Sequence, residues 1–213
     1  MPGAERDYTA LVRMPWIPAE ELFALLVAVS FAAGLNVYAT VATLGLLAHT
    51  HWLALPPSLA LLGSWWVIGA SVALFAVEFF ADKVPAFDLI WNALHTFIRV
   101  PVAALLAYQA SAGLSPLEQA AAAAVGGAIA LAAHGGKTAA RVAVTPSPEP
   151  LSNAGLSLGE DVLAVGITWL AVRHPYVAGG IALALVLFVA LLIRWVWSAL
   201  KALFRGAERV LAP

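Results

Sequence analysis

The sequence predicts an all-α, polytopic membrane protein. Of its 213 residues, 62% are hydrophobic and 11% are charged, whereas a water-soluble domain carries about 25% charged residues. The mean hydropathy is +0.91. The apolar residues are gathered in six segments, and about 20 apolar residues are enough for one helix to cross the bilayer core. Any function must therefore lie within the membrane or at its surface.

Composition also excludes several classes of function. Eleven Lys and Arg residues against twelve Asp and Glu residues give a formal net charge of −1. This balance leaves no basic surplus to attract a polyanion, so we expect no nucleic-acid partner. The chain has no cysteine, which removes disulfides, thiolate metal sites and a cysteine nucleophile.

The sequence predicts about six transmembrane helices. Their ranges are 20–49, 58–81, 86–111, 117–144, 157–173 and 176–197. Several exceed the minimum for a crossing and must tilt or break, and the first contains Gly34 and Asn36 near its middle. Together they form one transmembrane domain over 20–197, preceded by a cytoplasmic segment over 1–19 and followed by a tail over 198–213.

The distribution of basic residues predicts the orientation, because Lys and Arg near the ends of a span favour the cytoplasm. Arg6 and Arg13 precede the first segment, and Arg194 lies at the end of the last. Both termini are therefore predicted to be cytoplasmic, in the inner membrane. Lys201, Arg205 and Arg209 recur every four residues, which indicates an amphipathic tail helix on the anionic inner leaflet. Arg173 is the one basic residue that disagrees with this orientation, because it lies at a segment end that is predicted to be outside the cytoplasm.

Two regions of the chain resemble each other weakly. Duplication of a three-helix unit produces two halves of inverted topology, which many transporters use. The candidate halves are 20–111 and 117–197. The first helix of each contains a polar interruption, at Gly34 or at Gly135 and Gly136, and the second contains an acidic pair. The alternative is that glycines are simply common where membrane helices pack closely.

Many ionisable residues lie inside the apolar segments. Each costs about 2.5–3.5 kcal/mol at the bilayer centre, so such residues usually face a partner or water. We expect one cluster toward the cytoplasmic side, formed by Asn36, Glu78, Asp82, Lys83, Asp88, His95, Arg99, His134, Lys137, Arg141, Glu160 and Asp161. Its five acidic and four basic side chains nearly balance. This balance also fits a purely structural role, in which the charges pair with one another.

The residue types in this cluster suit three kinds of ligand, of which the first two are expected. The side chains expected to bind a small polar or anionic ligand are Asn36, His95, Arg99, His134, Lys137 and Arg141, because Arg and Lys bind phosphate or carboxylate groups. Those expected to hold a coupling ion or proton are Glu78, Asp82, Glu160 and Asp161. The acidic and histidine residues also suit a divalent metal, but no metal-binding spacing supports one, so we expect no cofactor.

Two short motifs resemble catalytic signatures but lack their context. The run Gly136 to Thr138 ends like a phosphate-binding loop, but that motif needs a glycine where Leu131 stands. The run Gly155 to Gly159 has the letters of a nucleophile elbow without a preceding strand. We interpret Ser157 and Glu160, like Ser115 and Glu118, as capping boxes at helix starts.

A set of polar motifs resembles a known family. The motifs are Gly34 to Tyr38, Glu78 to Pro85, Asp88 to Thr96, His134 to Arg141, Ser147 to Asn153 and the pair Glu160 and Asp161. In combination they resemble a bacterial integral-membrane family catalogued as a domain of unknown function, number 4126. The resemblance covers about residues 25 to 200 and implies a membrane location. It implies no activity, substrate or cofactor.

The sequence therefore predicts a transporter-like or permease-like protein that handles a small polar or anionic ligand through a cytoplasm-facing polar cavity. Gly34 and the pair Gly135 and Gly136 would be the helix breaks about which the halves move. The first alternative is a non-catalytic membrane scaffold or accessory subunit with internally paired charges. The second is a metal-dependent or lipid-modifying enzyme. The expected partners are the lipid bilayer and the small ligand, with a homo-oligomer left open.

Overall fold

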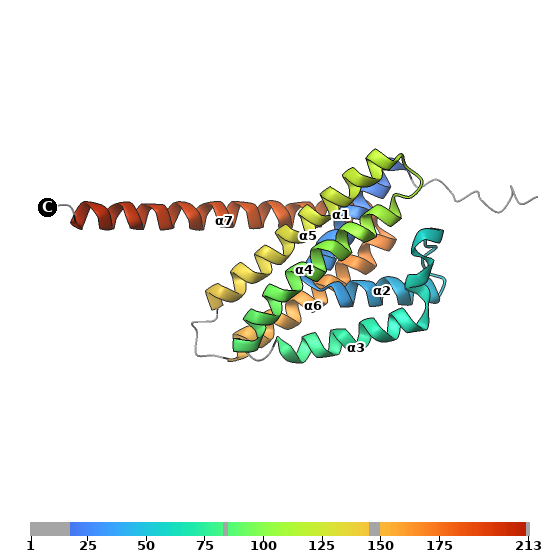
Figure 1. The fold of residues 1–213 in the computed structure, drawn as a ribbon, viewed down its shortest axis with the longest axis horizontal. Helices are drawn as coiled ribbons and strands as arrows, with labels where there is room; N and C mark the ends of the chain where they lie inside the picture. The colour runs from blue at the N-terminus through green and yellow to red at the C-terminus, as the bar shows by residue number, and fades with distance from the viewer. Residues whose placement is uncertain (1–17, 83–84, 145–149, 212–213) are drawn as a thin grey trace, which may run out of the picture.

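A computed structural model describes residues 18–82, 85–144 and 150–211 of the chain. Over these residues the protein is all-helical, as the sequence predicts (Figure 1). The elements are α1 (Ala19–Leu35), α2 (Val37–His49), the 3-10 helix η2 (Pro57–Gly63), α3 (Trp65–Ala81), α4 (Pro85–Ala110), α5 (Pro116–Val144), α6 (Pro150–Arg173) and α7 (Pro175–Leu211).

Three of the described helices are long and apolar enough to cross a membrane. They are Pro116–Ala140 in α5, Ala154–Arg173 in α6 and Pro175–Trp195 in α7. A fourth crossing is formed if η2 and α3, which meet at an angle of 61°, count as one bent span. The membrane character predicted from composition is therefore retained, with three or four such segments in the described chain instead of six.

The first predicted segment, 20–49, is broken at Asn36. This residue is extended, with φ −149° and ψ 103°, and separates α1 from α2. Its side-chain oxygen accepts a hydrogen bond from the Ala39 amide at 3.0 Å, so Asn36 is the N-cap of α2. Its carbonyl accepts a hydrogen bond from the Thr40 hydroxyl at 2.9 Å. A polar residue that caps a new helix thus ends the old one.

After the break, α2 runs back toward the end of the bundle at which α1 starts (Figure 1). Tyr38, at the start of α2, contacts His95 near the middle of α4. Ser58, which follows α2, donates a hydrogen bond to the carbonyl of Gln109 at the end of α4. Thus α2 runs parallel to α4. The single crossing predicted over 20–49 is replaced by two half-length helices.

The directions of α1, α5 and α7 differ from the predicted arrangement. Leu22 and Glu118, near the starts of α1 and α5, line one pocket, and Gly179 near the start of α7 lies against Ala24. All three helices therefore begin at the same end of the bundle. Helices related by inverted topology would run in opposite directions, so this arrangement gives no support to halves over 20–111 and 117–197.

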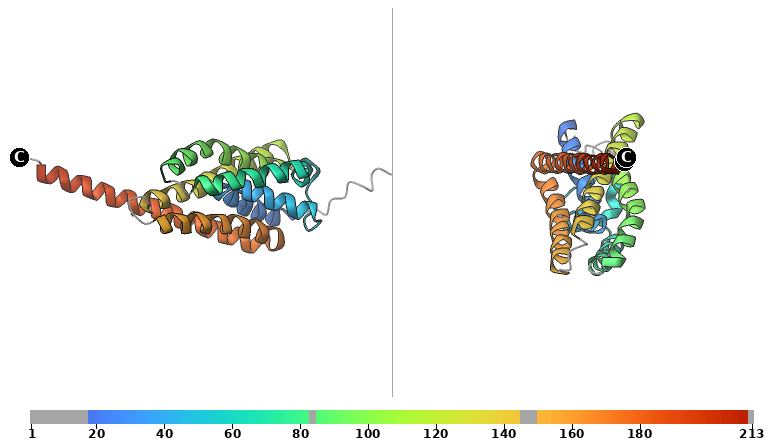
Figure 2. Two further views of the ribbon diagram at one scale, coloured as in Figure 1. Left: turned by 90° about the horizontal axis from the view of Figure 1, so that it is seen from below. Right: turned by 90° about the vertical axis from the view of Figure 1, so that its left-hand side faces the viewer.

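The far end of α7 projects beyond the other helices (Figure 2). This helix has 37 residues, which gives a length of about 55 Å against a bilayer core of about 30 Å. It is continuous through residue 198, where the sequence predicted a separate tail. Its end and the start of α1 lie at opposite ends of the bundle (Figure 1), whereas the sequence placed both termini on one side.

The core is built around α1. Every residue from Val27 to Leu35 is buried, as expected for a helix that is apolar all round and surrounded by others. Close approach depends on small residues, because a Cβ on Gly34 would lie 2.5 Å from the carbonyl oxygen of Ala130 in α5. The closest part of this packing therefore requires glycine.

Of three predictions about helix starts and breaks, one is confirmed and two are wrong. Ser115 and Glu118 form the predicted capping box, with the Ser115 amide 2.9 Å from a Glu118 carboxylate oxygen. Ser157 and Glu160 do not, because α6 begins earlier, at Pro150. Gly135 and Gly136 do not break α5, which is continuous from Pro116 to Val144.

We expect Gly34→Ala to destabilise the protein by about 1–3 kcal/mol, because the added Cβ meets backbone that can move only if α1 and α5 separate. The matched control is Gly135→Ala, whose Cβ meets nothing within 4 Å and which gains helix propensity. Thermal unfolding in detergent, followed by tryptophan fluorescence, checks both. A Gly34→Ala protein as stable as wild type would contradict the packing.

Candidate functional site

Six charged side chains meet in the interior of the bundle. They are Glu78 and Asp82 at the end of α3, Arg99 in α4, Lys137 in α5, and Glu160 and Asp161 in α6. We call this set the charge cluster. Its members are between 0% and 6% exposed, which is unusual because buried ionisable groups must be compensated by partners. The prediction that charges from separate segments gather at one place is confirmed for these six.

Arg99 connects three helices. Its guanidinium forms an ion pair with Glu78 of α3, and its Nη1 atom lies 2.7 Å from Nδ1 of His134 in α5. Because a guanidinium can only donate hydrogen bonds, Nδ1 of His134 must accept. Nε2 of His134 then carries the proton and donates to the hydroxyl of Thr96, 2.8 Å away. His134 is thus a neutral ring that orients Arg99.

Lys137 lies among four oxygen atoms. Its Nζ atom is 3.1 Å from Glu160 Oε2, 3.3 Å from Asp82 Oδ2 and 3.6 Å from Glu78 Oε1. It is also 3.4 Å from the carbonyl oxygen of Leu35, the last residue of α1. We call these four oxygens the lysine cage. The end of α1 adds to its negative potential, because the carbonyl end of a helix dipole is negative.

The break between α1 and α2 joins the charge cluster through Asn36. The side-chain amide of Asn36 donates a hydrogen bond of 2.8 Å to Asp161 Oδ1, while its oxygen caps α2. Asn36 is fully buried. Ser157, one turn before Asp161, lies 3.5 Å from Asp82. The same asparagine therefore ends α1, starts α2 and contacts an acidic residue of α6.

Negative charge exceeds positive charge among these described side chains. Four carboxylates and two cations give a formal sum of −2 (−4 + 2 = −2), with the histidines neutral. One oxygen of Glu78, Oε2, and one of Asp161, Oδ2, have no hydrogen-bond partner among the described residues. Burial and neighbouring negative charge both disfavour an ionised carboxylate. Among the described side chains, the two cations therefore do not balance the four carboxylates.

His95 belongs to a neighbouring hydrogen-bond chain. Its Nδ1 donates to the carbonyl of Trp91, 2.8 Å away, so its Nε2 accepts from the hydroxyl of Tyr38 at 3.1 Å. His95 is 2% exposed and lies one turn before Arg99 on α4. This chain connects the first turn of α2 with α4 beside the charge cluster.

The structure also identifies partners that the sequence analysis missed. These are Tyr38, Thr96, Ser157 and the Leu35 carbonyl. Thr96 could have been found by its spacing, because it lies three residues before Arg99 on the same helix face. The Leu35 carbonyl could not, because it becomes available only through the break at Asn36.

Some predicted members cannot be placed. Lys83 lies outside the described residues, and the side chains of Asp88 and Arg141 lie outside the described part of α4 and α5. The other predicted site residues, including Asn36, His95 and His134, all lie in or beside the charge cluster. Within the described chain, no group of three or more His, Asp or Glu side chains is arranged to hold a metal ion.

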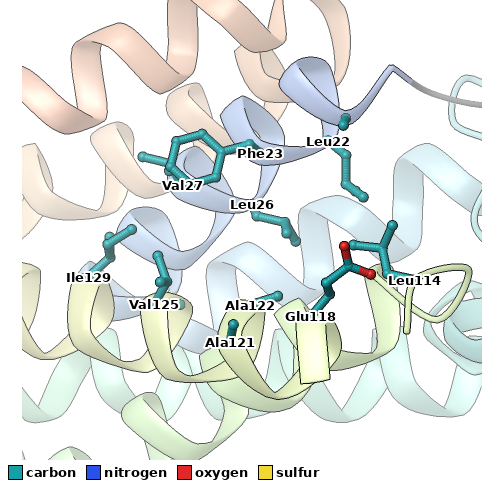
Figure 3. A pocket seen from close by; sticks show the side chains of 12 residues that line it. Leu22, Phe23, Leu26, Val27, Leu114, Glu118, Ala121, Ala122, Val125 and Ile129 are labelled. Carbon is teal, nitrogen blue, oxygen red and sulfur yellow. The ribbon is translucent and has the colours of Figure 1, made fainter. Parts of the chain in front are cut away.

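A separate pocket lies between α1 and α5 (Figure 3). It has a volume of about 250 Å³ and is lined mainly by apolar side chains such as Leu26 and Val125, with the Glu118 carboxylate at one end. Its lining includes no member of the charge cluster. This pocket is therefore not the polar cavity that the sequence predicted.

The chain matches one family profile, described as "Domain of unknown function (DUF4126)", over residues 23–195. It belongs to this family. The match confirms the resemblance found in the polar motifs, all of which lie between residues 34 and 161. No curated protein and no solved structure matches the chain.

We expect Arg99→Met to destabilise the protein by about 3–5 kcal/mol, because it leaves Glu78 buried beside other carboxylates without its main cation. Adding Glu78→Gln should recover part of this loss, since the uncompensated charge is then removed. The control is Arg173→Met, which removes an exposed arginine at the end of α6. If Arg99→Met and Arg173→Met unfold at the same temperature in detergent, the ion pair is not structural.

Proposed function

We propose that this protein is a transporter-like membrane protein in which the charge cluster holds protons or a small cation at the centre of the bundle. The observation that carries the proposal is the pair of buried carboxylates, Glu78 and Asp161, each with one oxygen that lacks a hydrogen-bond partner among the described residues, in a cluster whose described side chains sum to a formal charge of −2. Such an excess is costly in a medium of low dielectric constant unless protons or cations neutralise it. Intramembrane ionisable residues commonly mark ion pathways and proton relays.

The proposal includes a topology. We infer that α3 to α7 cross the membrane in alternating directions and that α1 and α2 enter and leave on one side. Helix α4 has 26 residues, enough for a crossing, and its Arg99 and His95 are turned into the bundle. Broken helices at membrane depth are tolerated where they are buried in protein, as Asn36 is.

Basic residues suggest the orientation of this topology. In the sequence Lys83 follows α3, and Arg141 belongs to the last turn of α5. Helix α7, with Arg194 and Lys201, extends toward the end of the bundle where α3 and α5 end (Figure 1). At the opposite end, Arg173 closes α6, and in the sequence Arg6 and Arg13 precede α1, so this end has fewer basic residues than the other. By the positive-inside rule the former end is cytoplasmic. The C-terminus would then be cytoplasmic and the N-terminus on the other side.

This topology is tested with tags at the two chain ends. We expect a C-terminal green fluorescent protein fusion to fluoresce, because the end of α7 is cytoplasmic. We expect an N-terminal epitope to be accessible from the periplasmic side of intact spheroplasts. A C-terminal epitope, which should be protected in the same cells, is the control. An N-terminal epitope that is also protected would restore the predicted arrangement of both termini in the cytoplasm.

The helix break provides the moving part in the proposed mechanism. Asn36 is hydrogen-bonded to Asp161, so protonation of this carboxylate would weaken a contact that positions α1 and α2 against α6. Half-helices that meet at a binding site are typical of transporters. The movement would occur at Asn36, since α5 is continuous through Gly135. Inverted repeats are no part of this proposal.

The contacts of Arg99 and Lys137 change the ligand that we propose from an anion to a proton or cation. Arg99 and Lys137 were expected to bind an anion, but both already lie against carboxylates of the protein. A bound anion would have to displace these carboxylates. A proton or cation, with a small polar solute moved by coupling to it, fits the charge excess better.

The membrane scaffold is the second candidate. It is favoured by one observation: the cationic groups of Arg99 and Lys137 lie against carboxylate, imidazole and carbonyl groups of the protein itself. In that case the charges hold α3, α4, α5 and α6 together, and water has no access to them. The two functions therefore differ in whether the charge cluster is reached from solution.

Accessibility can be measured directly because the chain has no cysteine. We expect Ser157→Cys, beside Asp82 in the charge cluster, to react with a small charged methanethiosulfonate reagent from the cytoplasmic side of inside-out vesicles. The matched control is Thr168→Cys, on the same helix, fully buried and hydrogen-bonded to Ala164. It should stay unlabelled. If neither cysteine reacts before unfolding, the scaffold is favoured and the transport proposal fails.

A further inference from the structure

Lys137 has the surroundings of a bound monovalent cation. Four oxygens of the lysine cage lie 3.1–3.6 Å from Nζ, and they come from three helices, α1, α3 and α6. A typical N–H to O hydrogen bond measures 2.7–3.2 Å, so the hydrogen bonds from Nζ to Asp82 at 3.3 Å and to the Leu35 carbonyl at 3.4 Å are long, and Glu78 Oε1 at 3.6 Å makes an ion pair only. The ammonium is therefore held by the field of the whole cage as much as by single bonds.

The cage contains a type of ligand that ion pairs rarely use. The Leu35 carbonyl belongs to the last residue of α1, and the carbonyls at the end of a helix lack partners within that helix. In broken transporter helices, such carbonyl ends coordinate cations. The ammonium of Lys137 lies at this position. Glu78, whose Oε1 lies 3.6 Å from Nζ, has its other oxygen, Oε2, buried without a hydrogen-bond partner among the described residues.

The dimensions of the cage select the ion. Calcium requires oxygens at about 2.3–2.6 Å, much closer than those around Nζ. This agrees with the absence of a metal-binding group of acidic or histidine residues in the described ranges. An ammonium or potassium ion is larger and carries the single charge that Lys137 supplies.

We propose that Lys137 fills a monovalent-cation site formed by the Leu35 carbonyl and the carboxylates of Glu78, Asp82 and Glu160, so that the protein provides its own cation there. The consequence for transport rests on the proposed function: with this site filled, the exchangeable cation of the wild-type cycle is the proton, taken up by carboxylates such as Asp161. Potassium or ammonium enters only when the lysine is removed.

The test is an equilibrium measurement on purified full-length protein in detergent, with potassium chloride and ammonium chloride as probes. Choline chloride at equal concentration controls for ionic strength, because choline is too large for the cage. We expect Lys137→Ala to have a lowered Tm that rises by at least about 2 °C, saturably, with either probe ion. Wild type should show no such rise. The matched control is Lys201→Ala, which removes an exposed lysine on α7 that lies over the Trp197 ring.

A second variant tests the proposal if Lys137→Ala does not fold. Lys137→Ala combined with Glu160→Gln removes one negative charge together with the positive one and keeps three cage oxygens from Leu35, Glu78 and Asp82. It should also be stabilised by potassium or ammonium over choline. Equal responses to all three salts, no response in either variant, or the same potassium response in wild type would overturn the proposal. This salt test measures only cation binding, whereas the labelling of Ser157→Cys measures whether the charge cluster is reached from solution. A failure of the cation site is therefore distinguishable from a failure of the proposed function.

Discussion

Compensation of buried charge is the constraint on which the described bundle depends. Six ionisable side chains from α3, α4, α5 and α6 are almost completely removed from solvent, and each would be costly there alone. Arg99 offsets this cost by joining α3, α4 and α5 through Glu78 and His134. Lys137 does so by contacting α1, α3 and α6. The relative positions of these helices are therefore fixed by electrostatics as well as by apolar packing.

The break at Asn36 connects this electrostatic centre to the shape of the fold. A continuous helix over 20–49 would satisfy its own carbonyls and present no polar end inside the bundle. With the break, the Leu35 carbonyl faces Lys137 and the Asn36 amide reaches Asp161. Close packing makes the arrangement possible, because Gly34 brings α1 against the backbone of Ala130. The local break, the glycine contact and the charge cluster thus support one another.

The same arrangement bears on both candidate functions. A scaffold needs charges that cancel, whereas a carrier needs a group that can change its charge. Among the described side chains, Arg99 contacts Glu78 and His134, Lys137 contacts three carboxylates, and the four carboxylates outnumber the two cations. Protons or cations can neutralise this excess reversibly. The apolar pocket between α1 and α5 lies apart from it and contributes no polar group except Glu118.

Residue types alone predicted the class of the protein and the six described members of the charge cluster. High apolar content demands a membrane environment or a very large core, and the cost of charge in a membrane predicts that Glu78, Arg99, Lys137 and Glu160 meet. These predictions follow from transfer energies, which depend on residue type and not on topology. The family could also be recognised from the spacing of its polar motifs.

The path of the chain could not be predicted in the same way, because it depends on contacts between residues far apart in the sequence. Hydropathy cannot distinguish one long crossing from two half-helices that turn back, because both bury the same apolar residues. The turn at Asn36 depends on a capping hydrogen bond and on Asp161, which is 125 residues away in the sequence. Likewise, the Ser157 and Glu160 pattern fits a helix start, but α6 begins earlier and both side chains turn toward α3 and α5. Long-range contacts, which no local pattern records, chose between these alternatives.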